Sequence, residues 1–252
     1  MLMQRLLLVS ALTVGVPACH SARSLAVPAP APPPAPAAQA SAAVPALPND
    51  IRWVQRSAEY HAAIIQAYRL ATMRVEQQGA TRASGSWAVV LDADETVISN
   101  LQYQIERIGL GYSGESWAAW VHRKEATPLP GAAVFLNRVR QLGGRIAIVT
   151  NRLESECEDT IAVFEARSLP FDAMLCRADK APSDKNPRFE AVAAGKTPAA
   201  SAPLTVVAFV GDNILDFPAA SQALREKGEA AFADFGVRYF MLPNPMYGSW
   251  ER

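Results

Sequence analysis

The chain has 252 residues, 50% of them hydrophobic, and its 24 lysines and arginines balance its 24 aspartates and glutamates. This length suffices for one sizeable α/β domain with a tail and leaves little room for two full domains. Because the net charge is zero and no Lys/Arg stripe appears, the composition argues against a protein that binds a nucleic-acid polymer.

Residues 1–19 are typical of a secretory signal. Arg5 precedes an apolar run over 6–16, which is shorter than the ~20 residues of a membrane-spanning helix. Val16-Pro17-Ala18-Cys19 resembles a bacterial lipobox, in which the cysteine is lipidated and becomes the mature N-terminus, although proline is an unusual occupant of its position. We expect a lipid anchor at Cys19, with ordinary signal cleavage as the alternative.

Residues 20–48 are mostly alanine and proline, with eight prolines and a single charge, Arg23. They show no periodic apolar pattern, so they are predicted to be a disordered linker. Pro-rich chain extends by ~3 Å per residue, which suits a spacer between a membrane and a domain. The folded domain is then expected over 49–252.

Helical and strand patterns alternate through this domain. A helix is predicted over 51–78, where Asn49-Asp50 caps its start and Gly79 stops it. Apolar runs at 86–91, 145–150, 171–176, 205–210 and 237–242 predict strands, and helical segments lie between them at 132–142, 155–167, 186–194 and 217–227. The alternation predicts an α/β fold with a parallel sheet covered by helices on both faces.

An insertion over 98–130 follows the first strand and is rich in aromatic residues, namely Tyr103, Tyr112, Trp117 and Trp120. Cys157 and Cys176 lie in the later part of the domain. If Cys19 is lipidated, these two cysteines are the ones that remain, and an oxidising compartment would allow them to pair. A disulfide and two buried free thiols are equally compatible with the sequence.

Polar residues follow several of the predicted strands. Asp92-Ala93-Asp94 comes after the first, Thr150-Asn151-Arg152 after the second, and Gly211-Asp212-Asn213 with Asp216 after the fourth, while Ser183-Asp184-Lys185 precedes the helix before the fourth. Ligands of open α/β sheets bind beyond the carboxyl ends of the strands. We therefore expect these residues to form one site.

The residue types of this site suit phosphoryl transfer. Asp92 and Asp94 lie two apart, so their side chains lean the same way along an extended chain. With Asp212 they form an oxygen-rich set that suits Mg²⁺. One carboxylate can attack phosphorus, and a second can protonate the leaving oxygen and then activate water. Thr150 offers a hydroxyl and Lys185 a positive charge. This ordered set is a far stronger signal than a lone D-x-D pair, which is common in solvated turns.

These motifs resemble the haloacid dehalogenase (HAD) superfamily, and more narrowly the class C acid phosphatases, the bacterial outer-membrane lipoprotein acid phosphatase / 5'-nucleotidase family. The matching stretches are WVQRSAEYHAAIIQAYRLA, VVLDADETVISN, TPLPGAAVFLNRV, IVTNR, DKNPRFEAV, FVGDNILDF and FMLPNPMYGSWE, and they span roughly 50 to 252. The resemblance implies a HAD-like Rossmannoid sheet with a small helical insertion and an N-terminal helix.

The resemblance also implies a role for each matching residue. Asp92 would be the nucleophile, and Asp94 the general acid and base. Asp92, Asp212 and the backbone carbonyl of Asp94 would bind Mg²⁺. Thr150 and Asn151 would hold the phosphoryl oxygens.

Further roles follow from the same resemblance. The motif lysine would be Lys185, with Lys180 as the alternative if the loop aligns differently, and Asp216 would lie just behind the metal ligands. Trp117, Tyr247 and Trp250 match family aromatics that stack on the substrate ring, although their spacing alone favours ordinary packing. Stacking would favour nucleotides and aryl phosphates.

We therefore expect a Mg²⁺-dependent acid phosphatase that hydrolyses phosphomonoesters, with 5'-nucleotides and aryl phosphates as substrates, through an aspartyl-phosphate. It would face the periplasm or the cell surface from the outer membrane, or be soluble in the periplasm if Cys19 is not lipidated. The rival hypothesis is a lipoprotein that binds a nucleotide or haem without turnover, but its signature would be the loss of Asp92 or Asp94. The oligomeric state is open, and a homodimer is among the options.

Overall fold

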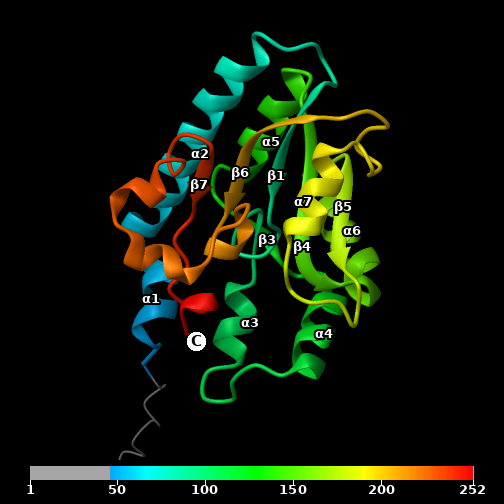
Figure 1. Cartoon of the computed structure of the whole chain (residues 1–252). Coiled ribbons are helices and arrows are strands. Elements are labelled where there is room, and N and C mark those ends of the chain that lie inside the picture. The colour runs from blue at the N-terminus through cyan, green and yellow to red at the C-terminus, as the bar shows by residue number, and fades with distance from the viewer. Residues whose placement is uncertain (1–45, 252) are drawn as a thin grey trace, which may run out of the picture. The chain divides into compact units, whose positions relative to one another are not determined.

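The computed structural model describes residues 46–251, which form a five-stranded parallel sheet with helices on both faces (Figure 1). The strand order is β5-β4-β1-β6-β7. The strands are β1 Trp87–Leu91, β4 Arg145–Leu153, β5 Ala173–Arg177, β6 Thr205–Gly211 and β7 Tyr239–Met241. The predicted fold class is thereby confirmed. Within 46–251, no helix is both long enough and apolar enough to cross a membrane.

The central strand is buried on both faces, which explains why it reads as an unbroken apolar run. Trp87, Val89 and Leu91 belong to a core shared with α2 (Ala58–Gly79), α5 (Ala132–Gln141) and α6 (Cys157–Ala166). Ala88 and Val90 belong to the opposite core, with α7 (Asn186–Ala193). Leu91 pairs with Ile148 on one side and Val210 on the other, so the residues that follow these strands reach the same edge of the sheet.

The helix predicted over 51–78 is instead two helices, α1 Asn49–Arg56 and α2, which are separated at Ser57. Ser57 has an extended backbone (φ −87°, ψ 136°), and its Oγ accepts a hydrogen bond from the Tyr60 amide at 3.1 Å. Serine favours this N-cap position because its hydroxyl satisfies an amide that has no partner within the helix. The prediction counted Ser57 as one more residue of a continuous helix, and that was wrong.

The helix predicted over 217–227 is also wrong, because this segment contains a 3-10 turn, Gln222–Lys227, in place of an α-helix, and a second 3-10 turn, Glu229–Phe232, follows it. Pro218 lacks an amide hydrogen, and Ala219 has a positive φ of 55°. No residue of either turn is buried. A short helix without an apolar face to bury is marginal in water, which explains the irregular course of this segment.

The aromatic insertion folds into a small cap below the carboxyl ends of the strands in Figure 1. It contains a two-stranded antiparallel pair, β2 Ile98–Ser99 with β3 Thr127–Pro128, and two helices, α3 Leu101–Glu106 and α4 Gly114–Arg123. Tyr103 and Trp120 are buried in it, and the Tyr103 and Trp117 rings meet edge to face with centroids 5.2 Å apart. Three short 3-10 turns, Glu154–Glu156, Ile214–Asp216 and Ser249–Glu251, complete the described elements.

Cys157 and Cys176 form a disulfide between the start of α6 and the edge strand β5. Of the two alternatives left open by the sequence, the structure therefore has the disulfide and not two free thiols. The two cysteines are 19 residues apart. Replacing both with serine should lower the free energy of unfolding by about 3 kcal/mol, because the unfolded chain regains the entropy of an open loop of this length. Denaturant unfolding of the double variant against the oxidised protein measures this loss, and an equal stability would mean that the pair contributes nothing.

Candidate active site

Three carboxylates and one lysine converge beyond the carboxyl ends of β1 and β6. Carboxylate oxygens of Asp92, Asp212 and Asp216 all lie within 4.8 Å of one another. The Nζ atom of Lys185 lies 2.6 Å from Asp92 Oδ1 and 2.6 Å from Asp216 Oδ1, and its side chain is 3% exposed. The structure thus brings together residues from three separate motifs. It also places Asp216 directly against the lysine, closer to the centre than predicted.

Local backbone geometry holds these acids in place. The Asp92 amide donates to Val210 O at 3.1 Å, which extends the parallel pairing one residue past β1. A Cβ atom at Gly211 would lie 2.3 Å from Asp216 Cβ, so only glycine allows this approach. The Asn213 amide donates to Asp216 Oδ2 at 2.9 Å across the 3-10 turn that follows β6.

The cluster carries more negative than positive charge. Burial raises the pKa of Asp92 to about 7, with Lys185 opposing this rise and Asp216 adding to it. Burial, Asp216 and Asp92 together raise the pKa of Asp212 well above its usual range. Burial alone would lower the pKa of Lys185, but the negative charges of Asp216 and Asp92 have the larger combined effect and raise this pKa above its usual value. Three acids beside one lysine leave an excess of negative charge, which a divalent cation would neutralise.

The donor set fits such a cation, because closely spaced carboxylates are the oxygen ligands that hard metal ions take. Asp212 is oriented from both sides, since Thr96 Oγ1 donates to its Oδ1 at 3.1 Å and Asn244 Nδ2 to its Oδ2 at 2.9 Å. The side chain of Asp94 is not one of the three clustered carboxylates. This agrees with the prediction for Asp94, in which its backbone carbonyl, and not its carboxylate, binds the metal ion.

The carboxylate of Asp94 accepts hydrogen bonds from Arg152 and Asn100. Arg152 donates to Asp94 Oδ1 from Nη2 at 2.8 Å and from Nε at 3.0 Å, and Nε lies 3.2 Å from Oδ2. Asn100 Nδ2 adds a third donor to Oδ1 at 2.9 Å. The Arg152 side chain is 1% exposed, against 16% for Asp94. This charge-assisted fork fixes the carboxylate of Asp94 beside Asp92.

Asn100 is fully buried and uses its whole amide group. Its Nδ2 donates to Asp94 and to Glu95 Oε2, the latter at 3.1 Å. Its Oδ1 accepts from Trp120 Nε1 at 2.7 Å and from Arg152 Nη2 at 3.1 Å. Asn100 therefore ties the cap helix α4 to the loop that carries Asp94.

The C-terminal segment reaches the same loop. The Tyr247 hydroxyl donates to Glu95, which is fully buried with a positive φ of 48° and also accepts from the Asn100 amide at 2.6 Å. Burial and Asp94 raise the pKa of Glu95 to about 7. Tyr247 is thus fixed through its hydroxyl next to the site.

Hydrogen bonds from neighbouring residues hold Thr150 and Asn151 in place. Thr150 is fully buried, and its Oγ accepts from the Arg152 amide at 3.1 Å. Arg188 donates to Thr150 O and, at 2.6 Å, to Asn151 Oδ1. Asn151 Nδ2 donates to Ser183 O at 3.0 Å. These bonds join the end of β4 to the loop that presents the lysine.

The sequence left Lys185 and Lys180 as alternatives for the motif lysine, and the structure places them in different surroundings. Lys185 contacts Asp92, whereas Lys180 is exposed in the preceding turn. The predicted aromatic residues differ as well. Trp117 is half-buried beside Arg152, whose Cζ lies 5.3 Å from the ring centroid, whereas Trp250 is 54% exposed. Cys19 lies outside the described residues.

Arg152 was expected at the site without a role, whereas Asn100, Arg188 and Asn244 were not predicted. Arg152 directly follows Thr150-Asn151, and Arg188 lies one helical turn after Lys185, so their positions in the sequence offered a signal. Asn100 has local partners in Asp94 and Glu95, six and five residues earlier, so its position offered a signal as well. Asn244 offered none, because its partner Asp212 lies 32 residues away.

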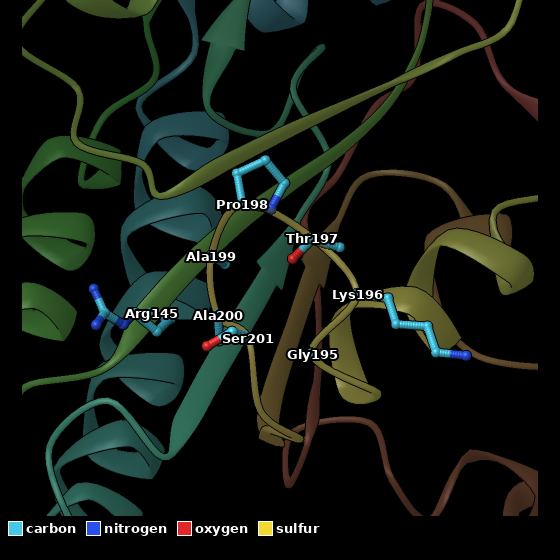
Figure 2. A pocket seen from close by; sticks show the side chains of 8 residues that line it. All are labelled: Arg145, Gly195, Lys196, Thr197, Pro198, Ala199, Ala200 and Ser201. Carbon is cyan, nitrogen blue, oxygen red and sulfur yellow. The ribbon is translucent and has the colours of Figure 1, made fainter.

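Two hollows flank the sheet at opposite ends. One of about 700 Å³ is lined by Arg145 and residues 195–201, and Figure 2 shows the Arg145 and Lys196 side chains on either side of this loop, pointing apart. Because Arg145 begins β4, this hollow lies at the amino ends of the strands, away from the acids. The other, of about 320 Å³, is lined by residues 183–186, Leu215 and Ala220, and it includes Lys185.

The chain matches the family model described as HAD superfamily, subfamily IIIB (Acid phosphatase), over residues 13–250. It is similar to the class C acid phosphatase from Bacillus anthracis, with 30% identity, a TM-score of 0.70, and coverage of 80% of this chain and 85% of that one. A second structure of the Bacillus anthracis protein, with tungstate bound, gives 29% identity, the same TM-score and the same coverage.

Proposed function

Because this chain belongs to the acid phosphatases of HAD superfamily subfamily IIIB, we propose that its site hydrolyses phosphomonoesters through an aspartyl-phosphate on Asp92. The enzyme class, a phosphoric monoester hydrolase, follows from the family and from the similarity to the class C acid phosphatase. The observation that carries the proposed mechanism is the pairing of Asp92 with buried Lys185, with Asp94 beside it. The alternative of a binding protein without turnover loses its basis, since both aspartates are present.

Asp92 is suited to the role of nucleophile. Lys185 holds its Oδ1, which leaves Oδ2 to attack phosphorus. The new bond joins Oδ2 to phosphorus while the bond from phosphorus to the leaving oxygen breaks. Lys185 and the backbone around Thr150 place positive charge and donors beside the transferred group, whose charge is spread over its oxygens. The tungstate in the Bacillus anthracis structure is a tetrahedral oxyanion of phosphate-like shape, which supports such a site.

Asp94 is suited to move the proton. In the first step its carboxyl proton goes to the leaving oxygen, which departs as an alcohol. In the second step Asp94 takes a proton from water as the water oxygen attacks phosphorus. The bond from phosphorus to Asp92 then breaks, and inorganic phosphate and free Asp92 result.

Asp92, Asp212 and the backbone carbonyl of Asp94 would hold Mg²⁺, with Asp216 beside them. When bound, the ion neutralises charge on the phosphoryl oxygens. Activity is expected to disappear in EDTA and to return with added Mg²⁺, because the acid cluster otherwise lacks positive charge. Phosphate release with each of several divalent cations measures this, and full activity in EDTA would contradict it.

For the substrate, we propose 5'-nucleotides and aryl phosphates. Trp117 and Tyr247 lie beside the loop of Asp94 and Glu95, so a ring carried by the leaving group would meet them. Stacking on aromatic side chains is worth ~1–3 kcal/mol per base. Phosphate release from nucleotides, aryl phosphates and small sugar phosphates should favour the first two classes by about tenfold or more. Equal rates for all three classes would argue against an aromatic clamp.

For localisation, we propose a lipid anchor at Cys19 in the bacterial cell envelope, on the basis of the lipobox-like sequence. Metabolic labelling with an alkyne fatty acid should mark the wild-type chain and leave Cys19→Ala unlabelled. Labelling of neither chain would instead favour ordinary signal cleavage and a soluble periplasmic protein.

A further inference from the structure

The two oxygens of Asp94 have unequal surroundings. Oδ1 accepts from Arg152 Nη2, Arg152 Nε and Asn100 Nδ2, all within 3.0 Å. Oδ2 accepts only the longer 3.2 Å contact from Arg152 Nε. A carboxylate oxygen with three donors has no lone pair left for a proton, so the carried proton must reside on Oδ2.

All three nitrogens of the Arg152 guanidinium donate hydrogen bonds. Besides Asp94, its Nη1 donates to Thr160 Oγ at 3.2 Å and its Nη2 to Asn100 Oδ1 at 3.1 Å. Arginine keeps its charge at any pH in a protein, and its planar fork fits a carboxylate in one orientation. Arg152 therefore fixes the direction in which Oδ2 points, and lysine could not reproduce this.

The same guanidinium contacts the ring of Trp117, with 5.3 Å between Cζ and the ring centroid. This contact is a cation–π interaction. A substrate ring stacked on Trp117 would therefore lie beside the group that orients Asp94. Trp120, on the same cap helix, donates to Asn100 at 2.7 Å and so supports the second side chain that donates to Asp94 Oδ1.

From this geometry we propose that Arg152 is a positioning residue, which aims Oδ2 of Asp94 at the leaving oxygen and links that aim to the ring face of Trp117. The inference rests on the proposed function. It goes further by stating which oxygen transfers the proton and which side chain selects it. Arg152 itself transfers nothing.

Leaving groups of different acidity test this directly. A nitro-substituted phenol departs without a proton, whereas a nucleoside or alkyl alcohol needs one, so in the first step only the latter depends on a well-aimed Asp94. The second step is the same for every substrate, so the test measures the first step alone, as the single-turnover rate of leaving-group release. Arg152→Lys should lose about 10²-fold or more in this rate with alkyl and nucleoside phosphates, the typical contribution of a general acid. Its loss with nitro-aryl phosphates should stay within about fivefold, since their leaving group needs no general acid.

The matched control is Arg138→Lys, at a partly exposed ion pair between α5 and Glu76 of α2, which makes none of the contacts described for the site and should behave as wild type with every substrate. An equal loss with all leaving groups would overturn the proposal and assign Arg152 a purely structural role. So would no loss at all. If the wild-type protein releases phosphate from no substrate, the proposed function fails and this inference falls with it.

Two further variants keep the test decisive. If Arg152→Lys does not fold, Trp120→Phe removes the donor to Asn100, together with part of a buried ring, and should show the same dependence on the leaving group, at about threefold to tenfold. The pair Arg152→Lys and Trp117→Leu should be non-additive with ring-bearing leaving groups, because the two side chains act through one contact. Additive losses, or a Trp120→Phe variant with uniform losses, would contradict the link.

Discussion

Asp92→Asn is expected to reduce phosphate release by about 10⁴-fold or more, as the loss of a catalytic nucleophile typically does. The asparagine amide is nearly the same size as the carboxylate but cannot form the acyl-phosphate bond. The measurement is kcat for an aryl phosphate at saturating substrate and Mg²⁺. Because the proposed intermediate is a covalent one, rapid quenching of the wild-type reaction should also trap phosphate on the chain, and Asp92→Asn should trap none.

Stability serves as the control for this variant. Asp92 is one of three carboxylates that share the single buried charge of Lys185. Removing one of these negative charges should leave the thermal unfolding temperature unchanged or raise it, since like charges held close together destabilise a fold. A folded Asp92→Asn protein that keeps wild-type activity would sink the proposed mechanism, whereas an unfolded one would show that the carboxylate has a structural role.

The strands were predictable because they are buried on both faces and therefore carry unbroken apolar runs. Trp87–Leu91 is the clearest case, with all five residues buried. The segment over 217–227 was not predictable from its composition, which suits a helix. Its course depends on Pro218 and on the lack of an apolar face, and the second of these appears only in three dimensions.

The site shows the same division. Asp92, Asp94 and Asp212 could be predicted because each follows a strand whose end lies at one sheet edge. Thr150 lies near the end of β4, and Lys185 directly precedes α7. The partners that orient them could not. Asn100 contacts Trp120 across twenty residues of the cap, and such a contact leaves no periodic or local trace in the sequence. Prediction from sequence thus identified the acids and the lysine that cluster in the structure, while most of the side chains that orient them required the structure.

Lys185 joins the stability of the fold to its chemistry. Its ammonium group is buried between Asp92 and Asp216 at 2.6 Å from each. Lys185→Met is expected to lower the free energy of unfolding by about 3–5 kcal/mol, because it leaves two buried carboxylates without their partner. It should also lower kcat by about 10²-fold or more, since the positive charge beside the transferred phosphoryl group disappears. Denaturant unfolding and phosphate release measure the two effects separately.

Lys180→Met is the matched control, because it removes the same side chain from an exposed turn five residues earlier. Its unfolding free energy should stay within about 0.5 kcal/mol of wild type, with full activity. Lys185→Met should gain more thermal stability from added Mg²⁺ than wild type does, since the acids that lost their lysine bind a cation more tightly. If Lys180→Met proved the inactive variant, the alternative loop alignment would hold in solution. If neither substitution mattered, the cluster of acids would not depend on a lysine at all.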